Sequence, residues 1–316
     1  MSVLGVDIGG TKIASALFTE KGEILSRDNV YLEGKTGSEV GALITGQINN
    51  LLKSPDLKED IVRSIGMCVP GISYSSEGTV WAPNIPGWDN YPLFDEVRAI
   101  AGNLPVKIDS DRACYMLGEL WKGNAKACNN AIFMAIGTGI GAGILVNGEI
   151  FRGSNDIAGS IGWMGLNKPY KSKYKECGCF EYHASGEGIA KVAGEYISQQ
   201  SSYKGQLARK KNSKISSYDV MDAFNNGDLL AQEVINECIE YWGMAVANMV
   251  SIFNPEKIIL GGGLFGPAKS LIPEIKKEAE KWAQPISIKH VILDHSALGS
   301  DAGVYGAAYM ALKNLP

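Results

Sequence analysis

Apolar and polar residues alternate along the chain in a way that predicts strands and helices in turn. Strands are expected at residues 3–7 and 12–18, where apolar and β-branched residues flank a glycine turn, with a short strand at 23–25. Apolar residues at helical spacing predict a helix over 38–52. A buried strand, "SIGMCVPG", and a loop through "WAPNIPGW" follow. The mixture of the two periods predicts an α/β fold.

The rest of the chain continues this mixture. Helices are expected near 92–101, over 111–121 and within 220–253, and short strands at "VKID" and "EKIILGGG". A last helix is expected near 302–312, where glycine and alanine residues form a small-residue face for close packing.

The opening strand–turn–strand pattern recurs at residue 131. The segments "DIGGTKIASALFTEKGEI" and "AIGTGIGAGILVNGEI" align with a small gap, and the second contains Asn147-Gly148, a strong hairpin signal. A repeat of this size predicts two related halves that face each other. The length of 316 residues also suits two domains of ordinary size.

Composition narrows the class of protein. Hydrophobic residues make up 45% and charged residues 20%, which is typical of a globular, soluble chain. The net charge of −4 gives no reason to expect nucleic acid or an acidic membrane surface as a partner. We expect no transmembrane helix, since no apolar run reaches about 20 residues, and no signal peptide. The six cysteines do not suggest a disulfide framework, so we expect a cytoplasmic protein.

Three glycine-rich turns carry the candidate chemistry. Backbone N–H groups in such turns can converge on an anion, because no Cβ blocks the approach. One such turn is usually just a turn, but three of them favour a nucleotide-binding site. A dinucleotide fingerprint is rejected for the second turn, because it should open a helix and here opens a hairpin. The turns contain Gly9, Gly10, Thr11 and Lys12; Gly137, Thr138, Gly139 and Gly141; and Gly261, Gly262 and Gly263.

Two acids stand at the ends of predicted strands, and one of them precedes the first glycine turn. Asp111 follows a strand and starts a helix, so it is either an N-cap or first-turn acid, or the general base of a phosphoryl transfer. Asp7 precedes the first glycine pair. It is either a strand-end turn residue or a ligand of Mg²⁺, directly or through water.

With these residues in place, the chain resembles the ROK family of sugar kinases, within the actin-like ATPase superfamily. The resemblance implies two actin-like (ribonuclease H-like) domains with a cleft between them: residues 1–112 with a C-terminal helix at about 300–316, and residues 113–299. The matching motifs run nearly end to end: "DIGGTK", "CVPG", "APNIPGW", the "D-(x)7-E" helix from Asp111 to Glu119, "GTGIGAGILVNGEI", "GCFE", "NPEKIILGGG" and "LGSDAGVYGAA".

The resemblance also implies a function. It implies a glucokinase-like enzyme that uses ATP and Mg²⁺ to phosphorylate a hydroxyl of a hexose or related sugar, commonly as a homodimer. Asp111 matches the catalytic base, and the "DIGGTK" hairpin matches the ATP-phosphate site with Asp7 near Mg²⁺. Gly71, Asn84 and Glu181 match sugar-contacting positions. Repressors of the family carry a winged DNA-binding domain before this motif, which here begins at residue 7, so we expect none.

The chain departs from the family pattern around the expected sugar site. Ser110 replaces the usual Asn before the base. Ser160 replaces a sugar-contacting Glu, and Trp163 replaces a His that contacts sugar and zinc. Of the zinc-binding cysteines only a lone "CGC", Cys177 to Cys179, is present, so we predict no structural zinc. An isolated His183 is expected to be a solvated or core residue.

These departures leave several interpretations open. Trp163 either offers a flat apolar face to a sugar ring or fills space vacated by zinc ligands. A plain hexose is the default substrate; an amino sugar, a cyclitol or a nucleoside-like polyol is the alternative. A non-catalytic sugar or nucleotide sensor of the same fold is the rival function.

Overall fold

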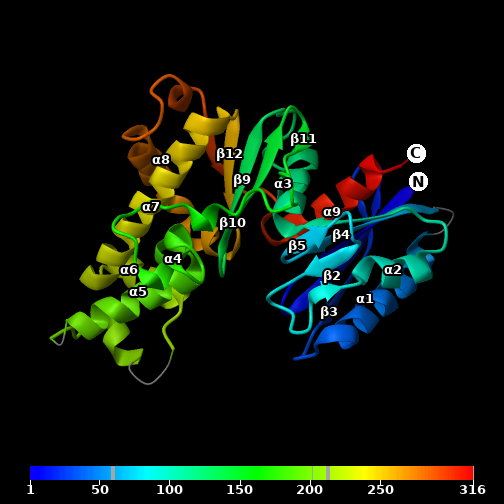
Figure 1. The fold of residues 1–316 in the computed structure, drawn as a ribbon, viewed down its shortest axis with the longest axis horizontal. Coiled ribbons are helices and arrows are strands. Elements are labelled where there is room, and N and C mark those ends of the chain that lie inside the picture. The colour runs from blue at the N-terminus through cyan, green and yellow to red at the C-terminus, as the bar shows by residue number, and fades with distance from the viewer. Residues whose placement is uncertain (58–60, 201, 211–213, 316) are drawn as a thin grey trace. The chain divides into compact units, whose positions relative to one another are not determined.

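The computed structural model describes residues 1–57, 61–200, 202–210 and 214–315. Contacts divide the chain into two compact units (Figure 1). The first comprises Met1–Ala127, Ile150–Ala158 and Ser300–Pro316, and the second comprises Cys128–Glu149 and Gly159–Gly299. The domain boundaries expected from the sequence stay a prediction.

The first unit is built on a five-stranded sheet with the order β3-β2-β1-β4-β8. Strands β1, β2 and β3 are antiparallel neighbours, whereas β1, β4 and β8 run parallel. A smaller sheet follows β4. The elements of this unit are β1 (Ser2–Ile8), β2 (Lys12–Thr19), β3 (Ile24–Tyr31), α1 (Gly37–Leu52), β4 (Val62–Val69), β5 (Ile72–Tyr74), β6 (Thr79–Trp81), β7 (Asp89–Tyr91), α2 (Leu93–Ala101), β8 (Val106–Ser110), α3 (Asp111–Trp121) and α9 (Ala302–Lys313).

Helices cover both faces of this sheet, with α1 and α2 on one side and α3 and α9 on the other (Figure 1). Alternation along β1 directs its side chains to the two faces. Leu4, Val6 and Ile8 pack in the core that includes α1 and α2, whereas Val3 packs with residues of α9. The predicted small-residue face of the last helix is confirmed by this packing.

Glycines on two neighbouring strands let α9 come very close to the sheet. Gly5 and Gly66 are register partners on β1 and β4. A Cβ at Gly5 would lie 2.5 Å from the Val304 carbonyl oxygen, and one at Gly66 would lie 1.9 Å from the Ala307 carbonyl oxygen. Any side chain here would therefore push the helix away from the strands.

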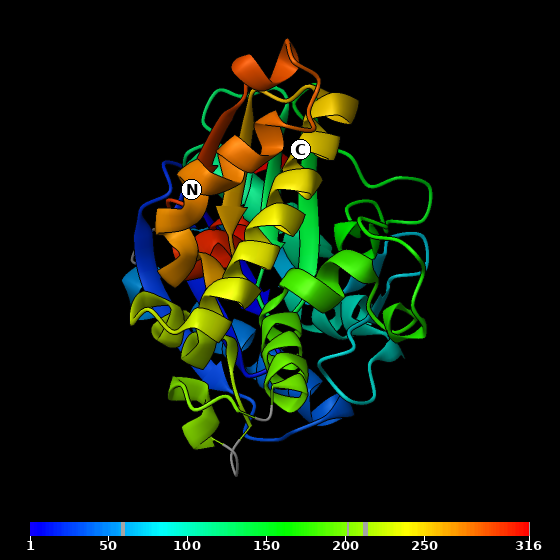
Figure 2. The ribbon, with the colours of Figure 1, turned by 90° about the vertical axis from the view of Figure 1, so that its left-hand side faces the viewer.

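The second sheet repeats the first, with the order β11-β10-β9-β12-β13. Its β9–β10 hairpin is antiparallel, and β9, β12 and β13 run parallel, so the predicted internal repeat is confirmed. The long helix α7 lies across one face (Figure 2). The elements are β9 (Ala131–Ile136), β10 (Ile140–Val146), β11 (Glu149–Ile150), α4 (Cys179–Ala184), α5 (Gly186–Gln199), α6 (Ser217–Asn225), α7 (Leu229–Phe253), β12 (Lys257–Gly261), α8 (Ile272–Glu280) and β13 (Ile292–His295).

The structure corrects several sequence expectations. Strand β3 extends to Tyr31, well beyond the predicted 23–25. The prediction stopped too early because this edge strand has a half-exposed face and is rich in polar residues. The predicted loop through "WAPNIPGW" is confirmed: only its first residue, Trp81, lies in a strand, and the loop connects β6 to β7. Helices α4, α5 and α8 and strand β13 were not expected. None of the helices in the described ranges has the length and apolar character needed to cross a bilayer.

The close approach at Gly66 predicts a large effect of a single methyl group. Gly66→Ala should lower the free energy of unfolding by roughly 1–3 kcal/mol, the usual cost of overpacking, measured by urea denaturation. Gly46→Ala is the matched control: it lies on α1 with no atom within 4 Å of its Cβ position, and should raise stability by about 0.5–1 kcal/mol. Equal stability of the two variants would contradict the packing argument.

Candidate functional site

The two predicted acids of the first unit lie at one edge of its sheet. Asp7 is near the end of β1, and Asp111 is the first residue of α3, directly after β8. Since β1, β4 and β8 are parallel, their carboxyl ends meet at this edge, where α/β proteins commonly bind ligands. Both side chains are half-buried.

Burial makes both acids weaker than usual. It raises the pKa of Asp7 to about 6, against the opposing effects of a hydrogen bond from Cys68 and the charge of Lys12. Burial also raises the pKa of Asp111 to about 6, opposed by Arg112 and assisted by the negative charge of Asp7. The two carboxylates therefore influence each other, and both titrate just below neutral pH.

The capping function at the start of α3 belongs to Ser110. Its Oγ accepts a hydrogen bond from the Ala113 N–H at 3.4 Å. Asp111 is the next residue, and its Oδ1 accepts from the Arg112 N–H at 2.7 Å. The helix thus has its N-cap without Asp111, so the N-cap interpretation of this acid is wrong, although it does lie in the first turn.

A third acid, Asp109, which the sequence analysis missed, lies at the same edge of the sheet. Asp109 on β8 accepts from Arg152 through Nε at 2.9 Å and a terminal nitrogen at 2.6 Å. Its other oxygen accepts from the Ser110 N–H at 2.8 Å. Asp109 is buried, whereas Arg152 is partly exposed. The available signal was an acid in a short predicted strand next to the apolar Ile108, because a carboxylate buried in a strand needs a partner.

The first glycine turn lies against a predicted sugar-contacting residue. The turn is closed by a bond from the Gly9 N–H to the Lys12 carbonyl at 2.9 Å. Gly10, Thr11 and Lys12 are exposed. A Cβ at Gly10 would lie 3.0 Å from the Cβ of Asn84, so the structure brings Asn84 and this turn together.

The loop that carries Asn84 is held by close packing. A Cβ at Gly71 would lie 2.0 Å from the Trp81 carbonyl oxygen, so only glycine allows this approach. Trp88 is buried, donates through Nε1 to the Gly37 carbonyl at 3.1 Å, and stacks on Tyr91 at 4.5 Å. Gly71 thus supports the loop that presents Asn84.

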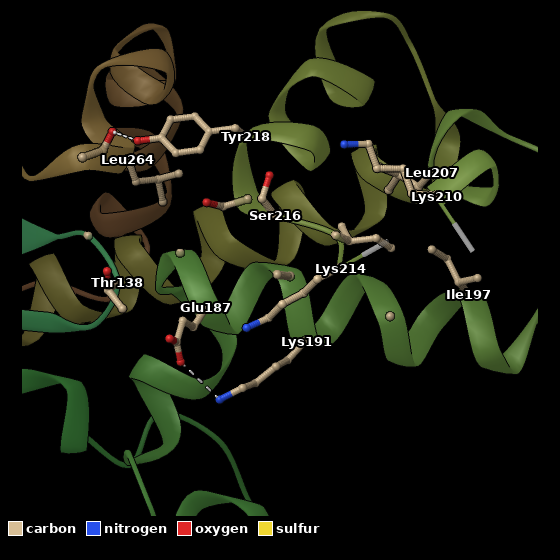
Figure 3. Close-up of a pocket in the computed structure, with 17 residues that line it drawn as sticks. Thr138, Glu187, Lys191, Ile197, Leu207, Lys210, Lys214, Ser216, Tyr218 and Leu264 are labelled. Atoms are coloured by element: carbon tan, nitrogen blue, oxygen red, sulfur yellow. Dashed lines mark hydrogen bonds and ion pairs between the residues drawn. The ribbon is translucent and has the colours of Figure 1, made fainter. Parts of the chain in front are cut away.

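The second unit contains a cavity of about 940 Å³ (Figure 3). Three residues of the predicted glycine turns line it: Gly137, Thr138 and Gly263. The other walls were not predicted and come from α5, from the start of α6, from the segment between them and from the 3-10 helix Gly263–Phe265. They are Gly186, Glu187, Ala190, Lys191, Gly194, Ile197, Leu207, Lys210, Lys214, Ile215, Ser216, Ser217, Tyr218 and Leu264.

The cavity combines apolar walls with positive charge. Ile197, Leu207 and Ile215 contribute apolar side chains to the wall. Lys191 lies 3.6 Å from Glu187, as the dashed line in Figure 3 marks, and Lys214 is exposed. Apolar walls, lysines and glycine-turn N–H groups together suit a ligand with a flat ring and an anionic group.

The other glycines of these turns have packing functions. A Cβ at Gly139 would lie 2.7 Å from a carboxylate oxygen of Glu181, and one at Gly261 would lie 2.2 Å from the ring of Phe133. Gly262 has a φ of 90°, a conformation that favours glycine. These three positions shape the backbone of the turns.

The predicted sugar-contacting residues of the second unit lie on α4 and on the short 3-10 helix Ile161–Trp163. Glu181 on α4 accepts from the Ile140 N–H at 2.6 Å, and burial raises its pKa. Ser160 is the residue before the 3-10 helix. Trp163 is 58% exposed. An indole that fills a vacated zinc site would be buried, so that interpretation of Trp163 is wrong.

The residues present do not fit a structural zinc ion. Both ring nitrogens of His183 contact other side chains: Nε2 lies 2.9 Å from the Tyr174 hydroxyl and Nδ1 lies 2.7 Å from a Glu237 oxygen. Burial raises the pKa of the Cys177 thiol, which disfavours the thiolate that zinc needs. In the described part of the chain, no three His, Cys, Asp or Glu side chains are placed to hold a metal ion.

Comparison with known sequences covers nearly the whole chain. The ROK family matches residues 3–314. A glucokinase from Halalkalibacterium halodurans is 34% identical over 316 residues, covering 97% of this chain and 94% of that protein. An N-acetyl-D-glucosamine kinase from Vibrio atlanticus is 28% identical, covering 98% of this chain and 99% of that protein.

Solved structures give the same fold. A ROK family glucokinase from Streptomyces griseus, in complex with glucose and AMPPNP, has a TM-score of 0.77 and 26% identity, covering 99% of this chain and all of that chain (100%). A ROK family transcriptional regulator, homologous to the E. coli MLC protein, has a TM-score of 0.85 and 27% identity, covering 98% of this chain and 77% of that chain.

The coupling between the two acids gives a testable titration. Asp7→Asn should lower the pKa of Asp111 below about 6, because it removes a neighbouring negative charge. The pKa should stay above the ordinary 3.8, because burial is the larger cause. The measurement is a ¹³C NMR pH titration of labelled aspartates. Asp89→Asn, on the exposed end of β7, is the control; an unchanged Asp111 titration in Asp7→Asn would refute the coupling.

Proposed function

The chain belongs to the ROK family, and we propose that it is an ATP-dependent sugar kinase in which Asp111 is the catalytic base. The relatives named glucokinase and N-acetyl-D-glucosamine kinase, and the structure with glucose and AMPPNP, support the reaction class. The observation that carries the assignment of Asp111 is its half-buried carboxylate, with a pKa of about 6, at the start of α3.

The raised pKa suits Asp111 to proton transfer at neutral pH. Most of the carboxylate is ionised at pH 7, yet it is a stronger base than an ordinary aspartate. It accepts the proton of the sugar hydroxyl as the hydroxyl oxygen forms a bond to the γ-phosphorus. The bond between that phosphorus and the β–γ bridging oxygen breaks, and ADP leaves.

Asp7 fits the hard cation that accompanies ATP. A carboxylate oxygen is the kind of ligand that Mg²⁺ prefers, and the pKa of about 6 fits a carboxylate with little compensating positive charge. A bound Mg²⁺ would neutralise phosphate charge. The exposed turn of Gly9, Gly10, Thr11 and Lys12 would contact the phosphates beside it.

The cavity of the second unit is the proposed nucleotide site. Its apolar walls around Ile197, Leu207 and Ile215 suit the flat purine base. The turn residues Thr138 and Gly263 would donate to oxygen atoms of the nucleotide, while the Gly137 N–H closes the turn by donating to the Gly139 carbonyl at 3.0 Å. Gly139, Gly261 and Gly262 would contribute by fixing the shape of these turns.

The proposed sugar contacts come from residues with different chemistry. Asn84 and Glu181 would bind hydroxyls, with Ser110 and Ser160 as shorter polar groups and Gly71 as support for the loop. The exposed ring of Trp163 offers a flat apolar surface to a sugar face. A plain hexose is the proposed substrate, and an amino sugar is the alternative that the relative from Vibrio atlanticus supports.

We further propose that the enzyme contains no structural zinc and works as a cytoplasmic homodimer, without nucleic acid or membrane as a partner. The net charge of −4 and six free cysteines are in line with this proposal. The rival function is a sugar sensor without catalysis. It is supported by the transcriptional regulator with a TM-score of 0.85.

Turnover with a sugar panel decides between kinase and sensor. With ATP and Mg²⁺, ADP formation should depend on one hexose or amino sugar. Asp111→Asn should lower kcat by about 10²–10⁴-fold while ATP binding is kept, and Asp89→Asn should not. In the wild type, kcat should fall as the pH drops below about 6, since Asp111 becomes protonated. Full turnover by Asp111→Asn would refute the assigned base, and sugar binding without turnover would favour the sensor.

Filling the cavity should affect one substrate only. Ala190→Trp places an indole in the cavity from α5 and should raise the KM for ATP at least about tenfold, equivalent to about 1.4 kcal/mol, with little change in the KM for sugar. Ala42→Trp on the exposed face of α1 is the matched control. An unchanged KM for ATP would place the nucleotide elsewhere.

A further inference from the structure

We propose that three side chains, Tyr174, His183 and Glu237, position the sugar-contacting residues of the second unit in place of a zinc ion. We call these three residues the clasp. This inference rests on the proposed sugar kinase function, in which Glu181 and Trp163 contact the sugar. The members of the clasp come from separate elements: the 3-10 helix Ser172–Tyr174, helix α4 and helix α7.

His183 is the centre of the clasp. It is 6% exposed, with Nε2 at 2.9 Å from the Tyr174 hydroxyl and Nδ1 at 2.7 Å from Glu237 Oε1. A carboxylate at this distance calls for a proton on Nδ1, which leaves Nε2 to accept from the Tyr174 hydroxyl. One imidazole on α4 therefore contacts side chains of two other elements, one through each ring nitrogen.

Aromatic rings enclose the imidazole. Tyr241 stacks on it with ring centroids 4.6 Å apart and an interplanar angle of 12°. Tyr174 and Tyr182 meet it at 5.6 and 5.4 Å with tilted rings. The stacked and tilted contacts restrict rotation of the ring about its own axis, so its two nitrogens stay directed at Tyr174 and Glu237.

A second layer of contacts holds the segment before α4. The Asn167 amide donates to the Tyr241 hydroxyl at 2.9 Å, and Lys173 contacts Glu195 at 2.8 Å. On the far side, the Tyr196 hydroxyl donates to the second oxygen of Glu237 at 2.5 Å. The segment before α4, where the resemblance would place zinc ligands, is fixed by amide, hydroxyl and ammonium groups.

The clasp is directly connected to the proposed sugar contacts. Glu181 lies two residues before His183 on the same short helix, α4, and its carboxylate accepts from the Ile140 N–H at 2.6 Å. At Gly178, just before α4, a Cβ would lie 2.5 Å from the Cα of Trp163 and 2.4 Å from the Gly162 carbonyl oxygen. A displacement of α4 would therefore move both Glu181 and Trp163.

Removing one hydroxyl tests the positioning function. Tyr174→Phe keeps the ring but loses the contact with His183, and should raise the KM for sugar about five- to tenfold with little change in the KM for ATP. Amide hydrogen exchange should speed up across residues 160–181. Tyr309→Phe is the matched control, because it removes the hydroxyl of a half-buried tyrosine that stacks on Trp121 in the first unit; both KM values should stay as in the wild type.

A graded pair of substitutions separates positioning from loss of fold. Glu237→Gln keeps an oxygen that can accept from Nδ1, and should retain most of the sugar affinity. Glu237→Ala should raise the KM for sugar and speed up exchange over 160–181. Equal effects of Gln and Ala, or equal changes in both KM values, would overturn the proposal.

Metal analysis completes the test independently of turnover. Zinc measured by mass spectrometry in protein purified without chelators should be far below one ion per chain, and 1,10-phenanthroline should leave the melting temperature unchanged. One zinc per chain, with a melting temperature that falls on chelation, would overturn the clasp. If no sugar supports turnover, the proposed function fails, whereas zinc content and hydrogen exchange still decide whether the clasp orders this segment.

Discussion

The close approach of α9 to the first sheet is the constraint on which the proposed catalytic chemistry depends. Gly5 and Gly66 let this helix lie on the strands, and a Cβ at Gly303 would reach within 2.2 Å of the Asp7 carboxylate. The same helix packs on α3, which begins at Asp111. Burial under these helices raises the pKa of both acids to about 6. Packing by residues with no chemistry of their own thus sets the basicity of the proposed catalytic base.

The two units use one sheet topology for different purposes. In the first, the strand ends present Asp7 and Asp111, and the hairpin turn is short and exposed. In the second, the corresponding turn at Gly137 and Thr138 lines a cavity together with α5, the start of α6, the segment between these helices and the turn at Gly263. The repeat supplies a glycine-rich turn in both units, and the elements that follow it determine what each turn can bind.

In the second unit, the proposed clasp would take the place of a metal site. A structural zinc joins separate segments through four strong bonds. His183 joins three elements through Tyr174, Glu237 and stacking on Tyr241. Each such contact is weaker than a metal–ligand bond, so the cluster needs many partners, and it accordingly extends to Asn167, Lys173 and Tyr196.

The sequence by itself determined the α/β class, the repeat, the three glycine turns and the candidate base, because periodicity, turn chemistry and motif order are local properties. Tertiary structure alone decided that Trp163 is exposed, that Ser110 caps α3, and that His183 is enclosed by tyrosines. It also revealed the Asp109–Arg152 pair, whose members are 43 residues apart, and the cavity walls around Ile197 and Ile215. Burial, pKa and cavity shape depend on which distant segments come together, and no local pattern in the chain encodes that.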